Sequence, residues 1–245
     1  MSWPRHIPKH ATGANGLGQW RRALWNRLPS SYATVGTPSQ GYPLGQRVLH
    51  VRSLPQRADL DVACLVEDDQ GQQLAAICPI SQDRHLVTGA TRFGLLDSRA
   101  LPMGFFSVVG VGANNVVGFA DVSGRAVGQL RRTNNFWQRL WSSAMDMTLE
   151  SGERTLGHTR VSVSPTARFS TVDEPIYDSA GAILATVSRK WRYVDTSVTF
   201  YDYSLVCEGP SVGPLPELML ATVFSHYLYD RRKVGGPFAG HTNFA

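Results

Sequence analysis

Short apolar runs alternate with polar turns through the middle of the chain. Three stretches repeat one pattern, "LVEDDQGQQLAAI", "VGFADVSGRAVGQL" and "EPIYDSAGAILATV", with the turns at Asp68–Gly71, Asp121–Gly124 and Asp178–Gly181. Aspartate can accept hydrogen bonds from the backbone two residues on, and glycine supplies the positive φ of a tight turn or bulge. Each stretch therefore predicts a β-hairpin. The turns start 53 and 57 residues apart, which indicates a repeated supersecondary unit.

Further strand-like runs lie between these hairpins. They are rich in Val, Thr, Tyr and Phe, the residues that favour β-strands, and cover residues 47–54, 104–111, 159–165 and 196–207. Most of residues 45–207 is therefore expected to be antiparallel β-structure.

Three segments have helical character instead. Residues 16–28 and 134–145 space their large apolar residues by three and four positions. Residues 215–233 begin with Pro216 and Glu217, which suit a helix N-terminus, and are followed by Gly235-Gly236-Pro237, which ends the helix. Between Leu218 and Tyr229 this helix is apolar on nearly every side. It is too short to span a bilayer, so we expect it to be buried in a protein core.

Composition and charge add expectations about binding partners and solubility. The chain has 245 residues, 42% of them hydrophobic, and a formal net charge of +5. Residues 1–58 carry eight Lys or Arg and no acidic residue, so they form a basic arm suited to an anionic surface. Cys64, Cys78 and Cys207 form no C-x-x-C pair, which predicts reduced thiols in the cytoplasm. No signal peptide and no long apolar span are recognised, so a soluble protein is expected.

The C-terminal third carries the most specific pattern. The hairpin at Asp178–Gly181 is followed by Lys190-Trp191, then the strand "SVTFYDYSLVC" and the apolar helix "LMLATVFSHYLYD". In this order of segments the chain resembles the phospholipid scramblase family, and more broadly the tubby C-terminal-like superfamily with the plant LURP-one-related proteins. The resemblance covers roughly residues 40–235.

The resemblance implies a mainly β fold, an antiparallel tubby-like barrel of about twelve strands closed around a buried C-terminal hydrophobic helix. It divides the chain into a basic N-terminal arm with a short amphipathic helix (1–40), the barrel domain (41–236) and a C-terminal tail (237–245).

The chain departs from the animal scramblases in its acidic residues. Their calcium loop needs closely spaced carboxylates, but here Asp195, Asp202 and Glu208 are spread over fourteen residues. The cysteine cluster and the proline-rich tail of the animal members are also missing. We therefore expect no metal site and no cofactor.

Motifs for catalysis are also missing. The chain has no G-x-S-x-G nucleophile motif, and the glycine-rich stretch 110–118 lacks the spacing and ending of a phosphate loop. His226 lies within the apolar helix, where a satisfied core histidine is the simpler interpretation. We expect a protein that is not an enzyme and has no catalytic residues.

Basic and aromatic residues form the candidate lipid- or anion-binding sites. In the arm they are Trp20, Arg21, Arg22, Trp25 and Arg27. Indole rings favour the membrane–water boundary and arginine binds phosphate, so this helix is suited to lie in a membrane interface. The alternative is that the same helix packs against the barrel.

A second candidate group is Arg189, Lys190 and Trp191. Here the alternative is that Trp191 packs within the barrel while its cationic neighbours remain in solvent.

These observations favour a non-catalytic protein that binds anionic phospholipid or a membrane surface, in the cytoplasm and peripheral at the inner membrane face. A soluble structural module that binds a protein partner remains the main alternative, and an active phospholipid scramblase a further one. Nucleic acid fits poorly as a partner, because from Asp59 onward sixteen basic residues face nineteen acidic ones.

Overall fold

A computed structural model describes residues 41–53, 64–81, 91–109, 116–134, 144–161, 171–192 and 200–234. Within these ranges a short 3-10 helix comes first, then twelve strands and one α-helix. They are η1 (Pro43–Gly45), β1 (Val48–Ser53), β2 (Cys64–Glu67), β3 (Gln73–Ser81), β4 (Thr91–Asp97), β5 (Pro102–Val109), β6 (Val116–Ala120), β7 (Ala126–Arg132), β8 (Met145–Ser151), β9 (Arg154–Val161), β10 (Val172–Asp178), β11 (Ile183–Arg192), β12 (Phe200–Cys207) and α3 (Leu215–Val234).

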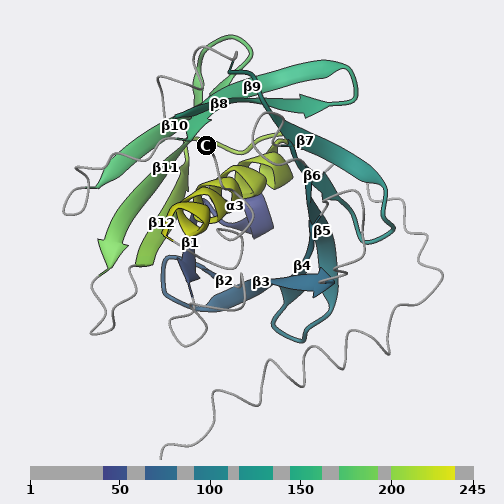
Figure 1. The fold of residues 1–245 in the computed structure, drawn as a ribbon, viewed down its shortest axis with the longest axis vertical. Coiled ribbons are helices and arrows are strands. Elements are labelled where there is room, and N and C mark those ends of the chain that lie inside the picture. Colours follow the sequence, from purple (N-terminus) through teal and green to yellow (C-terminus); the bar gives the residue numbers. More distant parts are fainter. Residues whose placement is uncertain are drawn as a thin grey trace, which may run out of the picture. The chain divides into compact units, whose positions relative to one another are not determined.

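The twelve strands form one closed antiparallel barrel (Figure 1). Each strand pairs with its neighbours in sequence, and β1 pairs with both β2 and β12. Leu49 lies opposite Leu205, and Val51 lies opposite Tyr203. Closure gives every strand two partners, which removes the exposed edges of an open sheet. The mainly β, twelve-stranded architecture expected from the sequence is confirmed.

Helix α3 fills the barrel, and the strands surround it in Figure 1. Its residues from Leu218 to Leu228 are all buried, as expected for a helix that is apolar on every side. Phe224 packs against Phe93 and Phe106 of the barrel wall, with ring centroids 5.1 and 4.9 Å apart. Gly128 of β7 leaves space for the helix, because a Cβ there would lie 3.1 Å from the side chain of Leu218.

All tight turns of the described residues are at one end of the barrel, which we call the hairpin end. They join β2 to β3, β4 to β5, β6 to β7, β8 to β9 and β10 to β11. The segment that precedes β1 and the segment between β12 and α3 are at this end too. The segments that connect strands at the opposite end lie outside the described residues, apart from short stretches next to the strands.

The three D-x-x-G hairpins are confirmed, and each glycine has a positive φ, between 80° and 88°. In each turn the aspartate Oδ1 accepts two backbone N–H bonds, as Asp121 does from Ser123 and Arg125, both at 2.9 Å. They join β2–β3, β6–β7 and β10–β11, so each hairpin is four strands from the next around the barrel.

A fourth turn of the same type, Asp97–Ala100, escaped the sequence pattern. Asp97 Oδ1 accepts the N–H groups of Arg99 and Leu101, both at 2.8 Å. Alanine replaces glycine at the last position and has a φ of 63°.

Of the other predicted strands and helices, some are present in the structure and some lie outside the described residues. The runs 47–54, 104–111, 159–165 and 196–207 correspond to β1, β5, β9 and β12, although β9 begins earlier and ends at Val161. The predicted helix 215–233 is α3. The helix 16–28, the arm and the tail lie outside the described residues. Of 134–145 only Asn134, Ala144 and Met145 are described, and Met145 begins β8.

No helix among the described residues is both long enough and apolar enough to cross a membrane.

Candidate functional site

The hairpin end of the barrel contains a cavity of about 300 Å³. It lies between η1, the first turns of α3 and the ends of β4 to β7. Its apolar lining comes from all three regions and comprises Tyr42, Pro43, Leu44, Leu95, Met103, Phe119, Val127, Pro216 and Leu220. A volume of this size is at the lower end of the range for small-molecule sites, which are mostly apolar with a few polar groups.

The η1 segment forms one side of the cavity, and the residues before it are hydrogen-bonded to the segment that precedes α3. Gly41 and Ser211 exchange two backbone hydrogen bonds of 2.9 Å. Leu44 has φ 51° and ψ 25°, a left-handed conformation that costs a residue with a branched side chain about 1–2 kcal/mol. Strain of this kind persists where the surrounding structure holds it, and binding sites are common places for it.

Two carboxylates, Glu217 of α3 and Asp121 of the β6–β7 turn, also line the cavity. The Ser123 hydroxyl donates a 2.6 Å hydrogen bond to Asp121, which is the main cause of a lowered pKa of that carboxyl. Burial acts in the opposite direction on Glu217 and raises the pKa of its carboxyl. Its Oε2 atom is buried and has no hydrogen-bond partner among the described residues. The cavity is therefore apolar with one poorly satisfied acidic group.

Exposed apolar side chains surround this end of the barrel. Five large hydrophobic residues at the hairpin end are between 41 and 53% exposed: Leu101, Met103, Val122, Ile183 and Val212. We call them the apolar rim. The sixth such residue of the described ranges, Val109, is 43% exposed and lies at the opposite end of β5. A cavity and an apolar rim at one place are typical of a binding surface.

A second hollow, of about 460 Å³, lies on the wall where β9 and β10 separate beyond the pair Thr159–Ile176. Its lining is largely polar and charged, with Arg160 bound to Asp146 at 2.7 Å and His158 stacked on Tyr177. None of its described lining residues is an exposed large hydrophobic side chain, whereas Met103 lines the hairpin-end cavity, so that cavity is the better candidate site for an apolar ligand.

Arg189, one of the predicted lipid-binding residues, points into the barrel and is 3% exposed. Its Nη1 donates to Asp230 Oδ1 of α3 at 3.1 Å, and the Tyr203 hydroxyl donates to Asp230 Oδ2 at 2.6 Å. Burial, together with the charge of Asp230, raises the pKa of Tyr203 well above its usual value, so it remains protonated. This group joins the helix to β11 and β12, and it places Arg189 away from the outer surface.

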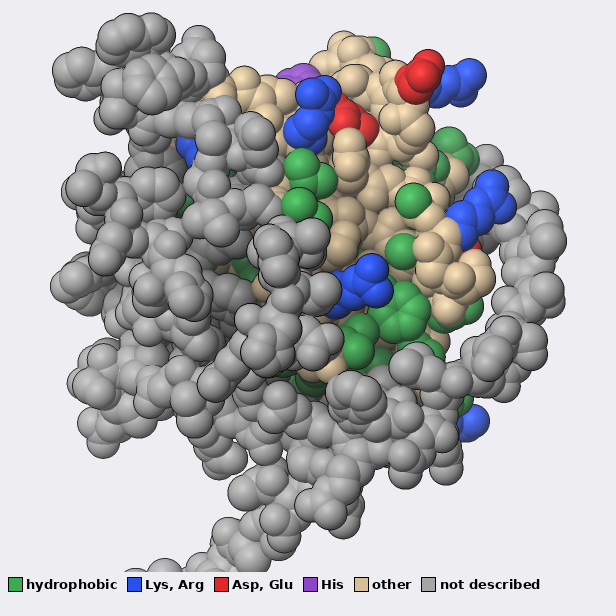
Figure 2. Space-filling model, turned by 45° about the vertical axis from the view of Figure 1, so that its right-hand side comes forward, with side chains coloured by type: hydrophobic (Ala, Val, Ile, Leu, Met, Phe, Trp, Pro, Cys, Tyr) green, Lys and Arg blue, Asp and Glu red, His purple; other side chains and the backbone are tan. Residues whose placement is uncertain are grey.

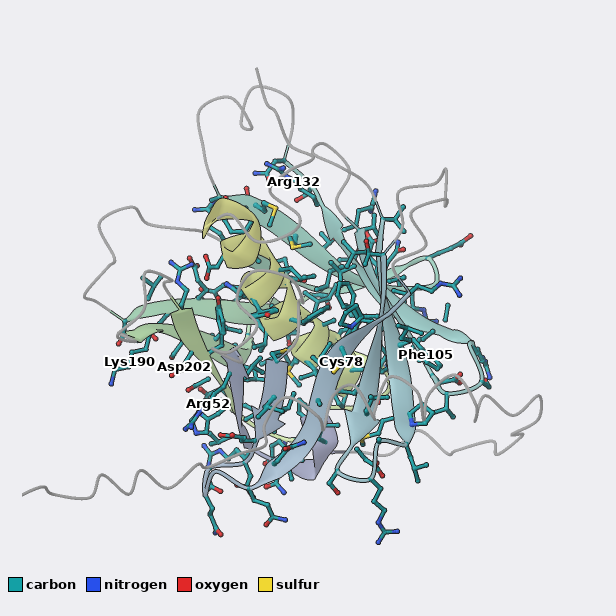
Figure 3. All side chains as sticks on the ribbon, turned by 60° about the horizontal axis from the view of Figure 1, so that its bottom comes forward. Arg52, Cys78, Phe105, Arg132, Lys190 and Asp202 are labelled. Carbon is teal, nitrogen blue, oxygen red and sulfur yellow. The ribbon has the colours of Figure 1, made fainter. Side chains whose placement is uncertain are left out.

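Lys190 lies on the outside of the barrel, opposite Asp202 of β12, which in turn lies opposite Arg52 of β1 (Figure 3). Opposite charges on neighbouring strands attract each other, so Asp202 offsets part of the positive charge of Lys190 and Arg52.

The remaining predicted residues are not described with their side chains. Strand pairing places Trp191 opposite Tyr201, but the side chain of Trp191 lies outside the described set. Trp20, Arg21, Arg22, Trp25 and Arg27 lie outside it entirely. Of the predicted site residues, the structure describes the side chains of Arg189 and Lys190, and these two lie on opposite faces of the barrel wall.

Basic side chains are scattered singly over the described surface in Figure 2, with acidic and hydrophobic side chains between them. Among the described residues no group of three or more potential metal ligands lies together. Asp202 and Glu208, two of the acidic residues considered for calcium, are about 20 Å apart along β12 and its extension. Asp195 lies outside the described residues.

The sequence reasoning identified Glu217 as a helix-start residue and Asp121 as a turn residue, but not as neighbours of one cavity. Leu44 and the apolar rim were not identified at all. One signal was present: a glutamate at the start of an otherwise apolar helix is partly buried whenever the helix is.

No protein-family model matches the chain. No curated protein matches it either. Among solved structures, the X-ray structure of a protein from Arabidopsis thaliana is similar, with 13% identity and a TM-score of 0.41, covering 79% of this chain and 98% of that one. The class of the protein rests on the barrel itself: twelve antiparallel strands closed around a C-terminal helix.

Proposed function

We propose that this protein is a non-catalytic, scramblase-like barrel that binds a phospholipid or a membrane surface, with the hairpin end as its contact. The observation that carries the proposal is the cavity of about 300 Å³ beside the apolar rim. Burying exposed apolar area contributes about 25 cal/mol per Å², so several half-exposed side chains at one end give a useful driving force.

The basic arm has a separate part in the proposal. Its arginines favour approach to anionic headgroups, at about 1 kcal/mol for each residue near the surface. Trp20 and Trp25 then insert at the interface. Electrostatic approach is sensitive to salt and apolar contact is not, so the two contributions can be separated experimentally.

The test is co-sedimentation with phosphatidylcholine vesicles, with and without phosphatidylserine, at low and near-physiological salt. Four variants are compared with the full chain: one lacking residues 1–28, Trp20→Ala/Trp25→Ala, Leu101→Ser/Val122→Ser, and the control Val109→Ser at the opposite end. Val109 matches the rim residues in type and exposure.

We expect deletion of the arm to abolish the salt-sensitive binding and the rim variant to weaken binding several-fold, while Val109→Ser has no effect. The double tryptophan variant should bind more weakly than the full chain, and equal binding would exclude indole insertion. If the full chain binds no vesicle under any condition, the lipid proposal is wrong and the alternative of a soluble protein-interaction module takes its place.

A further inference from the structure

The hairpin-end cavity has a chemical preference that follows from its charges. Two carboxylates line it, and no lysine or arginine is found among its described lining residues. The two turns beside it, β4–β5 and β6–β7, each carry one acidic and one basic residue, Asp97 with Arg99 and Asp121 with Arg125. The two carboxylates of the lining therefore disfavour an anionic group in the cavity and favour a cation.

One oxygen of Glu217, Oε2, is buried in the cavity wall and has no hydrogen-bond donor among the described residues. A buried carboxylate oxygen without a hydrogen-bond donor costs about 1–3 kcal/mol or more. An ammonium group supplies three donors and the opposite charge in one small unit. The rest of the lining, including Leu95, Phe119 and Leu220, is apolar and suits an alkyl chain.

Resting on the proposed function, we propose that this cavity selects an amphiphile with an ammonium head group, with Glu217 as its counter-ion and the alkyl chain against the apolar lining. Asp121 is a second carboxylate at the same cavity and is held by its turn hydrogen bonds. An amphiphile of equal length with a carboxylate head would be repelled by both groups. One with a hydroxyl head would gain only a neutral hydrogen bond, which is roughly half as strong as a charge-assisted one.

The test is calorimetric titration of the full chain with dodecylamine and dodecanoate below their micelle concentrations and with dodecanol below its solubility limit. The variants are Glu217→Gln, the control Glu153→Gln in the exposed β8–β9 turn, and Met103→Trp, which places a larger side chain at the half-exposed edge of the cavity. Circular dichroism melts confirm that each variant is folded.

We expect the amine to bind and the carboxylate not to bind. Glu217→Gln should weaken amine binding about 10- to 100-fold, as expected for the loss of one charged hydrogen bond. Glu153→Gln should leave it unchanged, and Met103→Trp should weaken binding of any amphiphile at this site.

Equal affinity of the wild type and Glu217→Gln for the amine would overturn the inference. Equal affinity of the wild type for all three amphiphiles would overturn it too but would leave the proposed amphiphile binding in place. Vesicle binding without any binding of the three single-chain compounds would place lipid contact outside this cavity. Such a result would refute the inference and retain the proposed function.

Discussion

Arg189, Asp230 and Tyr203 show how a residue in a basic-aromatic sequence cluster can belong to the core. Strand alternation turns Arg189 inward beside Ala185 and Val187, and the helix brings Asp230 to it from 41 residues away. The ion pair is buried on both sides, at 3% exposure for each side chain. Such a pair adds little net stability over apolar residues, but removal of one partner leaves an uncompensated buried charge.

We expect Arg189→Met to lower the free energy of unfolding by about 3–5 kcal/mol, since Asp230 then lacks its cation. Arg189→Met/Asp230→Asn should recover much of this loss, because no charge remains buried and Tyr203 keeps an acceptor. Urea unfolding followed by circular dichroism measures both. A double variant as unstable as the single one would show that packing, and not the charge, sets the cost.

The buried His226 makes the stability of the folded protein depend on pH. Burial, with a smaller contribution from the Arg189 charge, lowers its pKa to about 3. An unfolded histidine has a pKa near 6.5, so between these values the unfolded chain binds a proton that the folded chain does not. Stability therefore falls as pH falls through this window.

Between pH 7 and pH 4.5 the wild type should lose about 2–3 kcal/mol more unfolding free energy than His226→Gln, which does not titrate. Urea titrations at the two pH values measure the difference. Equal losses in the two proteins would mean that His226 is protonated in the folded state.

At the scale of elements, four turns share one geometry but not one sequence. Three end in glycine, and the turn Asp97–Ala100 ends in an alanine at φ 63°. A Cβ in this region costs about 1–2 kcal/mol, partly offset because alanine restricts the unfolded chain more than glycine does.

Ala100→Gly should therefore raise the free energy of unfolding by up to about 1 kcal/mol, and Gly124→Ala should lower it by about 1–2 kcal/mol. Thermal melts of the two variants test whether the free energy of unfolding changes in these opposite directions. Destabilisation by Ala100→Gly would show that the alanine side chain contributes more through its contacts than its backbone strain costs.

At the scale of the whole molecule, closure makes the strands depend on one another. Cys64 and Cys207 lie in the core, and Cys78 is 7% exposed. None of the three forms a disulfide, and burial raises the pKa of Cys207 to about 11. A thiol reacts as the thiolate, so burial and a raised pKa both slow the reaction.

We expect all three thiols to react slowly with a water-soluble thiol reagent in the native protein, and to become reactive together at one urea concentration. A closed barrel has no edge strand that can separate alone, so β2, β3 and β12 should open in a single transition. Variants that each keep one cysteine assign the reactivity. Early reaction of Cys78 alone would show that β3 opens before the rest.

The sequence by itself determined the features that depend on neighbouring residues. The D-x-x-G turns form through hydrogen bonds within five residues, and α3 must be buried because its own side chains are apolar on every side. Only the tertiary structure decided which strands meet, that Arg189 faces Asp230, and that η1, β4–β7 and the start of α3 enclose one cavity. These contacts join segments far apart in the chain, and they depend on strand register and barrel closure. A one-residue shift in register would turn every side chain of a strand to its other face.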